Sequence, residues 1–151
     1  MIRVGEALFD AGEEISAFEK RASGSGAVVS FLGKVRGNAG VTQVNSIVLE
    51  HYPGVTERSI TEIETTARKR WTIDDVLIIH RVGEMEPNEP IVLVCVASAH
   101  RREAFEAADF LMDYLKTEAI FWKKERGSDG DKWIEPRDAD YRDAGRWKKG
   151  E

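Results

Sequence analysis

The stretch 91-IVLVCVASAHRREAFEAADFLMDYLKT-117 carries the two strongest structural patterns in the chain. Residues 91–97 form an uninterrupted apolar run with the length of a buried strand, which predicts the central strand of a sheet. Over residues 101–117, apolar residues recur at helical spacing and predict an amphipathic helix. Its apolar face comprises Ala104, Phe105, Ala108, Leu111, Met112 and Leu115. A strand followed directly by such a helix indicates a layered fold.

Weaker patterns on both sides of this stretch predict further strands and helices. We expect strands over 26–32, 44–50, 76–81, 120–126 and 132–135, and helices over 13–21 and 56–70. Residues 127–130, Gly-Ser-Asp-Gly, predict a hairpin turn between the last two strands. Residues 33–40 and 84–90 are expected to be loops. Strands that alternate with helices indicate an α/β or α+β class, and periodicity alone leaves both open.

The overall composition is typical of a soluble globular protein. With 151 residues, we expect a single domain over 1–151, whose polar end, residues 138–151, forms a loosely ordered tail. Hydrophobic residues make up 42% and charged residues 32%, and the net charge of -5 argues against nucleic-acid binding. The N-terminus does not resemble a secretory signal, and the longest apolar run is too short to cross a membrane. We therefore expect a cytoplasmic protein without a membrane partner.

The cysteine and histidine content argues against a metal site. Cys95 is the single cysteine, so it cannot form an internal disulfide, and its place in an apolar strand indicates a core residue. His51, His80 and His100 lie far apart without the spacing of metal ligands. The sequence contains no Walker or dinucleotide-binding motif.

Two basic segments lie next to structural breaks where an anion could bind. Lys34, Val35 and Arg36 stand in a glycine-rich loop, where backbone N–H groups can approach a ligand and an arginine can bind an anion with two hydrogen bonds. An ordinary basic hairpin loop would have the same sequence, and the residues alone favour that interpretation. His100 and Arg101 precede the strongest helix, where free N–H groups suit an anion. Here an anion site and a purely structural pair are equally supported.

A third group of basic residues lies near the end of the strongest helix. Lys116 is expected to end that helix and Lys123 to lie on the next strand. A lysine at a helix C-terminus usually does no more than complement the helix dipole. Lys123 and Lys124 alternate faces on a strand, so only one of them can point inward with Phe121. Arg137 follows later in the chain and carries little information by itself.

Six segments, taken together, resemble the family of molybdopterin synthase large subunits. They are, in order, 26-GAVVSFLGKVR-36, 49-LEHYPG-54, 79-IHRVG-83, 98-SAHR-101, 112-MDYLKT-117 and 121-FWKKE-125. Each segment is weakly specific, but six in the same order are strongly specific, and the resemblance runs from about Gly26 to Arg137. Many members of this family have proline where this chain has Ile120.

The resemblance implies an α+β fold of the α/β hammerhead type with an additional antiparallel β subdomain. It implies a sulfurtransferase that moves sulfur from the C-terminal thiocarboxylate of a small ubiquitin-like subunit, which ends in Gly-Gly, to cyclic pyranopterin monophosphate. The product is the dithiolene of molybdopterin, made during molybdenum cofactor biosynthesis. The resemblance further implies a homodimer at the centre of a heterotetramer. No resident cofactor is expected, because the pterin phosphate is the substrate and the sulfur arrives on the partner.

The resemblance also implies the residues of the site, and their charges suit two anionic reactants. We expect Lys116 and Lys123 to be catalytic. We hypothesise that His100, Arg101 and Arg36 hold the pterin phosphate, with part of the site supplied by a second protomer. The residues expected to bind substrate are Lys34, Val35, Arg36, His100, Arg101, Lys116, Lys123, Lys124, Glu125 and Arg137.

Two other functions are compatible with a basic pocket. A non-catalytic module could bind the Gly-Gly tail of a ubiquitin-like protein by strand addition, but His100 and Arg101 would then have no role. A phosphate-ester hydrolase would need a metal cluster or a clear nucleophile, and the sequence indicates neither.

Overall fold

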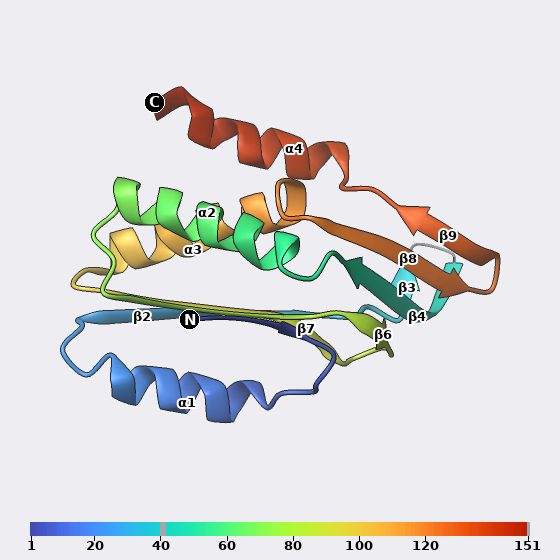
Figure 1. The fold of residues 1–151 in the computed structure, drawn as a ribbon, viewed down its shortest axis with the longest axis horizontal. Helices are drawn as coiled ribbons and strands as arrows, with labels where there is room; N and C mark the ends of the chain where they lie inside the picture. Colours follow the sequence, from blue (N-terminus) through green and yellow to red (C-terminus); the bar gives the residue numbers. More distant parts are fainter. Residues whose placement is uncertain (40–41, 151) are drawn as a thin grey trace.

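The computed structural model describes residues 1–39 and 42–150, which form two sheets with helices on both faces of the first (Figure 1). The four-stranded sheet has the order β1-β5-β7-β2, and the five-stranded sheet has the order β3-β4-β8-β9 with β6 also on β4. In chain order the elements are β1 (Ile2–Gly5), α1 (Ala11–Arg21), β2 (Ala27–Lys34), β3 (Asn38–Ala39), β4 (Thr42–His51), α2 (Val55–Arg70), β5 (Asp75–Arg81), β6 (Gly83–Met85), β7 (Pro90–Ser98), α3 (Arg101–Thr117), β8 (Phe121–Gly127), β9 (Gly130–Ile134), α4 (Asp138–Gly145) and a 3₁₀ helix (Arg146–Gly150). This architecture confirms the α+β class.

Strand β7 lies inside the first sheet, antiparallel to β5 on one side and to β2 on the other. Its side chains alternate between two buried layers. Val92, Val94 and Val96 pack in the cluster beneath α2 and α3, while Leu93 and Cys95 pack with α1. Because helices cover both faces, this strand is apolar at nearly every position. The predicted central strand is thus confirmed, and Cys95 is a buried core residue.

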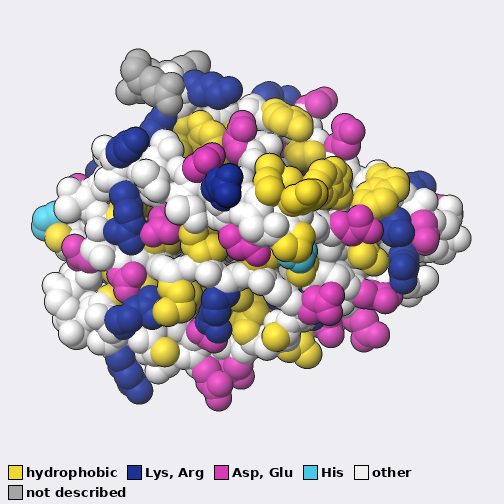
Figure 2. Space-filling view, in the orientation of Figure 1, with side chains coloured by type: hydrophobic (Ala, Val, Ile, Leu, Met, Phe, Trp, Pro, Cys, Tyr) yellow, Lys and Arg dark blue, Asp and Glu magenta, His cyan; other side chains and the backbone are white. Residues whose placement is uncertain are grey.

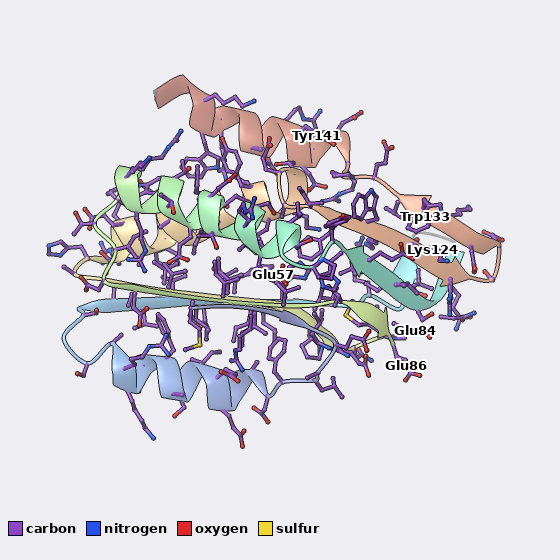
Figure 3. The ribbon with its side chains drawn as sticks, in the orientation of Figure 1. Glu57, Glu84, Glu86, Lys124, Trp133 and Tyr141 are labelled. Carbon is purple, nitrogen blue, oxygen red and sulfur yellow. The ribbon has the colours of Figure 1, made fainter. Side chains whose placement is uncertain are left out.

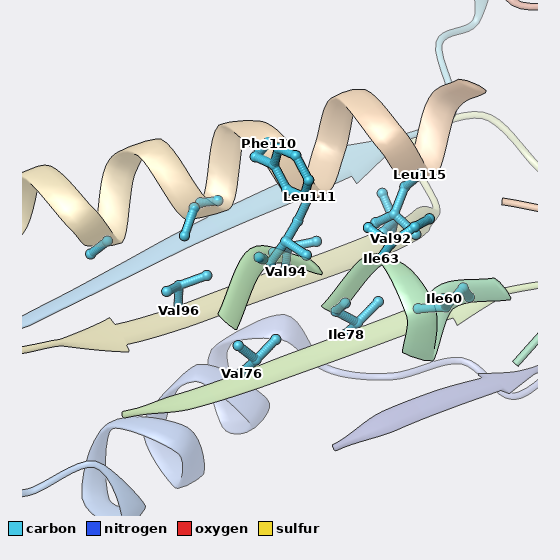
Figure 4. Close-up of a cluster of buried hydrophobic side chains, with 14 residues drawn as sticks. Ile60, Ile63, Val76, Ile78, Val92, Val94, Val96, Phe110, Leu111 and Leu115 are labelled. Carbon is cyan, nitrogen blue, oxygen red and sulfur yellow. The ribbon is translucent and has the colours of Figure 1, made fainter. Parts of the chain in front are cut away.

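Helix α3 covers one face of this sheet beside α2, and it has the bounds that the sequence predicts (Figure 4). Its buried residues are Ala104, Ala107, Ala108, Phe110, Leu111 and Leu115. Phe105, which helical spacing assigns to the same face, is 61% exposed. In the part of the chain that the structure describes, none of the helices has the length and apolar character needed to cross a membrane.

The second sheet is the additional antiparallel unit expected from the resemblance, and it is built on β4. Strand β8 pairs with β4 so that Leu49 lies opposite Lys123. Strands β8 and β9 form the predicted hairpin, closed by the pair Gly127 and Gly130. Gly130 has a φ of +92°, a conformation that favours glycine. The hairpin thereby fixes which face of β8 each lysine occupies.

Three short strands appear where no strand is predicted, and the two-residue β3 is one of them, inside the expected loop 33–40. Strand β1 pairs in parallel with β5, and β6 pairs with β4 inside the segment expected to be a loop. With four and three residues, β1 and β6 are too short to show a period, and each is defined by a partner distant in sequence. Strand β2 extends to Lys34, into the other expected loop, and Gly40 of that loop lies outside the described residues.

The C-terminal segment is folded over the helix layer, whereas we expected a loosely ordered tail. Residues 138–150 form α4 and the 3₁₀ helix, and α4 packs against α3. Trp147 contacts Trp71 edge-on, with 5.5 Å between ring centroids. Arg146 forms ion pairs with Asp109 and Asp113 of α3 at 2.7 and 2.8 Å. These few anchors are easily missed in a segment that is polar overall.

Candidate active site

Lys116 and Lys123 come together at the junction of the two sheets. Lys116 lies in the last turn of α3, the chain reverses, and Lys123 follows on β8, as predicted. Burial lowers the pKa of Lys123 below its usual value, and the nearby ammonium group of Lys116 lowers it further. Arg36 acts in the same direction, whereas Glu125 and Asp140 oppose the shift. The structure thus places three cations from separate segments around one site.

The turn that joins the two lysines is held by hydroxyl groups of α2. Thr56 Oγ1 donates to the carbonyl of Ile120 at 2.7 Å and accepts from the backbone N–H of Tyr52 at 2.9 Å. Ser59 Oγ accepts from the N–H of Ile120 at 3.2 Å. Both backbone groups of Ile120 are therefore paired, and the return from α3 to β8 has a fixed path.

A buried histidine lies beneath the site. His80 on β5 is 8% exposed, and its ring stacks on Phe121 at 4.1 Å between centroids. Its Nδ1 lies 2.9 Å from the carbonyl of Arg81, which can only accept, so this nitrogen carries the proton. Burial lowers the pKa of His80 to about 4, and Lys116 also lowers it. His80 is therefore an uncharged, buried side chain that lines the site.

The basic loop after β2 contributes Arg36 but not the side chain of Val35. Val35 is 3% exposed and packs with Val44, Ile47 and other residues of a small core. Its backbone N–H donates to the Glu89 carbonyl at 3.0 Å, and its carbonyl accepts from the Asn88 N–H at 2.9 Å. Val35, expected among the substrate-binding residues, thus anchors the loop. Lys34 is exposed at the end of β2.

The two neighbours of Lys123 in the sequence have different surroundings. Glu125 lies on the same face of β8 and pairs with Lys123 at 3.8 Å. Lys124 lies on the opposite face, where its Nζ stands 5.2 Å from the ring centroid of Trp133 (Figure 3). Of the two adjacent lysines, Lys123 is therefore the one in the site, and Lys124 belongs to the outer face of the hairpin.

An apolar patch lies on the outer side of this region. Figure 2 shows hydrophobic side chains gathered where β8, β9 and the start of α4 meet. The large exposed apolar residues of these segments and of the nearby β4–α2 turn are Tyr52, Trp122, Trp133 and Tyr141. Clustered exposed aromatic residues commonly mark a contact surface for another protein.

Arg137 and Asp140 bring the start of α4 to the same site. Arg137 is the residue before the helix, and its backbone N–H donates to Asp140 Oδ2 at 2.9 Å. Burial by itself would raise the pKa of Asp140. Hydrogen bonds from Arg137 and attraction to Lys116 outweigh this effect and hold the pKa below its usual value. Asp140 thus hydrogen-bonds to Arg137 and is close enough to Lys116 to be influenced by its charge.

His100 and Arg101 lie at the opposite end of α3. They line an open groove together with Gly26, Ala99, Arg102, Phe105 and Glu106. Lys116 lies fifteen residues after Arg101 on the same helix, which at a rise of 1.5 Å per residue is about 22 Å. Within one chain, His100 and Arg101 therefore do not join Arg36, and the phosphate clamp that we expected from these three residues is not formed by a single protomer.

Sequence reasoning missed two residues of the site. His80 stands in an apolar strand without metal-ligand spacing, and although it belongs to the family-like segment 79–83, the sequence does not indicate its position beneath Lys116. Asp140 stands in the segment assigned to a loose tail. One available signal was the spacing of Arg137 and Asp140, which suits the first turn of a helix. Among the described residues, no group of three or more His, Cys, Asp and Glu side chains could hold a metal ion.

Comparisons with known proteins identify the family. The family model described as MoaE protein matches residues 4–118. The molybdopterin synthase catalytic subunit of Salmonella typhimurium is 51% identical over 146 residues, 97% of each chain. A solved molybdopterin biosynthesis MoaE protein from Burkholderia ambifaria has a TM-score of 0.83 and 42% identity, covering 98% of this chain and 97% of its own.

A more distant structure has the same fold. The complex of subunits 1 and 2 of molybdopterin-converting factor from Helicobacter pylori contains a chain that matches with a TM-score of 0.73 at 17% identity, covering 91% of this chain and 90% of its own. At that identity the likeness concerns the fold alone. The family model and the Salmonella relative both span most of the chain, and the chain belongs to the MoaE family of molybdopterin synthase catalytic subunits.

Proposed function

We propose that this chain transfers sulfur from the C-terminal thiocarboxylate of a small ubiquitin-like subunit to cyclic pyranopterin monophosphate, and so forms the dithiolene of molybdopterin. The observation that carries this proposal is the group of Lys116, Lys123 and Arg36 in a chain of this family. Both reactants are anions, and fixed cations bring anions together and stabilise the charge that develops in the transition state. In this reaction the sulfur comes from the partner and the pterin is the substrate, so no resident cofactor is required.

Lys116 acts at the reacting carbon in this proposal. At the end of α3 its ammonium group can stabilise a developing oxyanion or transfer a proton, and the neutral His80 beneath it adds no competing positive charge. Lys123 supplies a second cation, which binds the thiocarboxylate of the donor. Lys34, Arg36 and Arg137 are the further substrate-binding residues in this proposal, and Glu125 orients Lys123 through its ion pair.

The proposed site is completed by a second copy of the chain. Because about 22 Å of helix separates His100 and Arg101 from Lys116, these two residues can meet the lysine pair only if they come from another protomer. The groove at His100 then holds the pterin phosphate at the N-terminus of the partner's α3, where free N–H groups favour an anion. A homodimer built in this way contains two composite sites.

The small subunit is proposed to dock at each end of this dimer. The apolar patch of Tyr52, Trp122, Trp133 and Tyr141 offers a contact surface beside the lysine pair. The solved complex of subunits 1 and 2 from Helicobacter pylori gives a precedent for a chain of this fold bound to a second subunit. We place the assembly in the cytoplasm, where Cys95 stays a free thiol.

One reconstitution tests the proposal. Purified chain, thiocarboxylated small subunit and pyranopterin monophosphate are mixed, and dithiolene product is measured by mass. We expect product with the wild-type chain and none with Lys116→Ala. The matched control is Lys20→Ala, which removes an exposed lysine from α1 on the far side of the first sheet and is expected to leave turnover unchanged.

The outcome separates this function from its competitor. Product that disappears with Lys116→Ala, while the variant keeps its fold and binds the small subunit, supports the proposal. Tight binding of the Gly-Gly tail without any product would instead indicate a tail-binding module. Full turnover by a folded Lys116→Ala variant would overturn the assignment of Lys116.

A further inference from the structure

Asp140 accepts one short and one long hydrogen bond at the start of α4. Its side chain is only 11% exposed. One oxygen accepts from the backbone N–H of Arg137 at 2.9 Å, and the other accepts from the Arg137 guanidinium at 3.4 Å. The same carboxylate therefore begins the helix and restrains the side chain that precedes it.

Helix α4 packs against α3, and Arg146, which follows α4, pairs with Asp109 and Asp113 of α3. The start of α4, with Asp140, therefore lies at the end of α3 that carries Lys116 (Figure 1). Lys116 attracts the carboxylate of Asp140, and Asp140 in turn raises the pKa of Lys123. The charged and titratable groups around the lysine pair come from every element packed there: Arg36 after β2, His80 on β5, Glu125 on β8, and Arg137 and Asp140 at α4. Of the two carboxylates, Glu125 is already paired with Lys123.

Asp140 is the second carboxylate, after Glu125, at a site that is proposed to bind two anionic reactants, and its presence there needs an explanation. It repels the phosphate and the thiocarboxylate, so for substrate binding alone it is unfavourable. It has a benefit, however, because two lysines beside an arginine repel one another, and the resulting field favours loss of a proton. A fixed negative charge opposite them keeps both ammonium groups protonated while they await the substrate.

We propose that Asp140 is a positioning residue of the sulfur-transfer site, which fixes Arg137 at the edge of the site and balances the charge of Lys116 and Lys123. The competing explanation for the position of Asp140 is that it only caps helix α4. The inference rests on the proposed function for its catalytic meaning, but its electrostatic part can be measured without turnover.

The first measurement is an NMR titration of Lys123 in the full chain, with ¹³C-labelled lysine side chains and the resonance assigned by Lys123→Arg. Asp140→Asn keeps an oxygen acceptor for the Arg137 N–H but removes the charge. We expect the pKa of Lys123 to fall by about half a unit in this variant, a shift typical of a screened neighbouring charge. Asp138→Asn removes an equal charge from an exposed position in the same helix turn and is expected to leave the pKa of Lys123 unchanged.

The second measurement is the pH dependence of sulfur transfer. With Asp140→Asn, the alkaline fall in turnover should move to lower pH by about half a unit, so that the rate there drops about threefold. Thermal unfolding of the same variant should show only a small loss of stability, because the cap is kept while a favourable charge at the helix N-terminus is lost. Asp138→Asn again serves as the control, and its profile should overlay that of the wild type.

The outcomes are distinguishable from those of the proposed function. If wild-type chain makes no product, the function fails, while the NMR titration still decides whether Asp140 controls the lysine charge. If the pKa of Lys123 is the same in all three chains, the proposal is overturned, and Asp140 is only a helix cap. In that case Asp140→Ala would lower thermal stability without moving the pH profile.

Discussion

The most informative single residue beneath the site is His80, because it is a titratable group that the fold keeps neutral. Its Nδ1 proton is used by the Arg81 carbonyl, and its ring is covered by Phe121. A protonated imidazole here would add a buried positive charge next to Lys116. Burial of this kind has a consequence for stability, since the folded and unfolded chains then bind protons differently.

The stability of the protein should depend on pH through His80. The pKa is about 4 when folded and 6.5 for an ordinary histidine, so between these values the unfolded chain binds the extra proton. The contribution of His80 to stability is therefore complete above 6.5 and declines as the pH falls toward 4. At about pH 5 the loss amounts to about 2 kcal/mol.

Urea unfolding at about pH 7 and pH 5 measures this difference. His80→Gln keeps a donor for the Arg81 carbonyl but cannot titrate. From pH 7 to pH 5, its free energy of unfolding should therefore fall by about 2 kcal/mol less than that of the wild type. His51→Gln, at the half-buried end of β4, is expected to keep the wild-type pH dependence. Equal losses in the wild type and His80→Gln would refute a neutral buried imidazole.

For single residues, the predicted positions agree best with the structure where the sequence pattern fixes the element that carries the residue. The positions of Lys116 at a helix end and of Lys123 on the following strand could be predicted from the pattern, whereas their grouping into one site followed only from the family resemblance. The role of His80 could not be predicted, because it arises from the pairing of β5 with β7 and from the approach of Phe121 from a distant part of the chain. Asp140 depends in the same way on α4 packing against α3.

Among the elements, the turn between α3 and β8 decides how the two lysines meet. Thr56→Val retains the shape of the side chain but leaves the Ile120 carbonyl and the Tyr52 N–H without their partner. Unpaired buried polar groups cost about 1–3 kcal/mol, so we expect the free energy of unfolding to fall by that amount. Turnover should fall more than substrate binding, because the lysines lose their alignment.

A neighbouring threonine provides the control for this variant. Thr61 is exposed on the same helix, and its hydroxyl donates to the carbonyl of Glu57 one turn earlier. Thr61→Val makes the same chemical change away from the turn and should alter stability by less than about 0.5 kcal/mol. Chemical denaturation together with steady-state kinetics compares the two variants. Equal effects of the two substitutions would show that the hydroxyl of Thr56 has no special role in the turn.

The elements that the sequence predicts are those whose pattern is long enough to repeat. Helix α3 and strand β7 show several periods of their own, and their bounds follow closely from the sequence. Strands β1 and β6 and helix α4 depend instead on partners. Strand β1 has a parallel neighbour, β6 pairs with β4, and α4 is held by the contacts of Arg146 and Trp147 with the helix layer. Local propensity is too weak to determine such segments without their tertiary contacts.

For the whole molecule, helix α3 acts as a rigid spacer with a basic group at each end. His100 and Arg101 stand at its beginning and Lys116 in its last turn, about 22 Å apart. A continuous helix cannot bend enough to bring its ends together, and its buried face fixes it along the first sheet. If both ends serve one reaction, each active site must therefore combine the beginning of one α3 with the end of another.

Mixing two inactive variants tests this arrangement. In a dimer of one Lys116→Ala chain and one Arg101→Ala chain, one composite site is intact and the other lacks both groups. Random exchange makes about half of the dimers mixed, so turnover should recover to about a quarter of the wild-type value. Lys116→Ala mixed with Lys123→Ala should recover nothing, because both lysines belong to the same half-site. If the first mixture also stays inactive although subunits exchange, His100 and Arg101 do not complete the partner's site, and the composite arrangement is wrong.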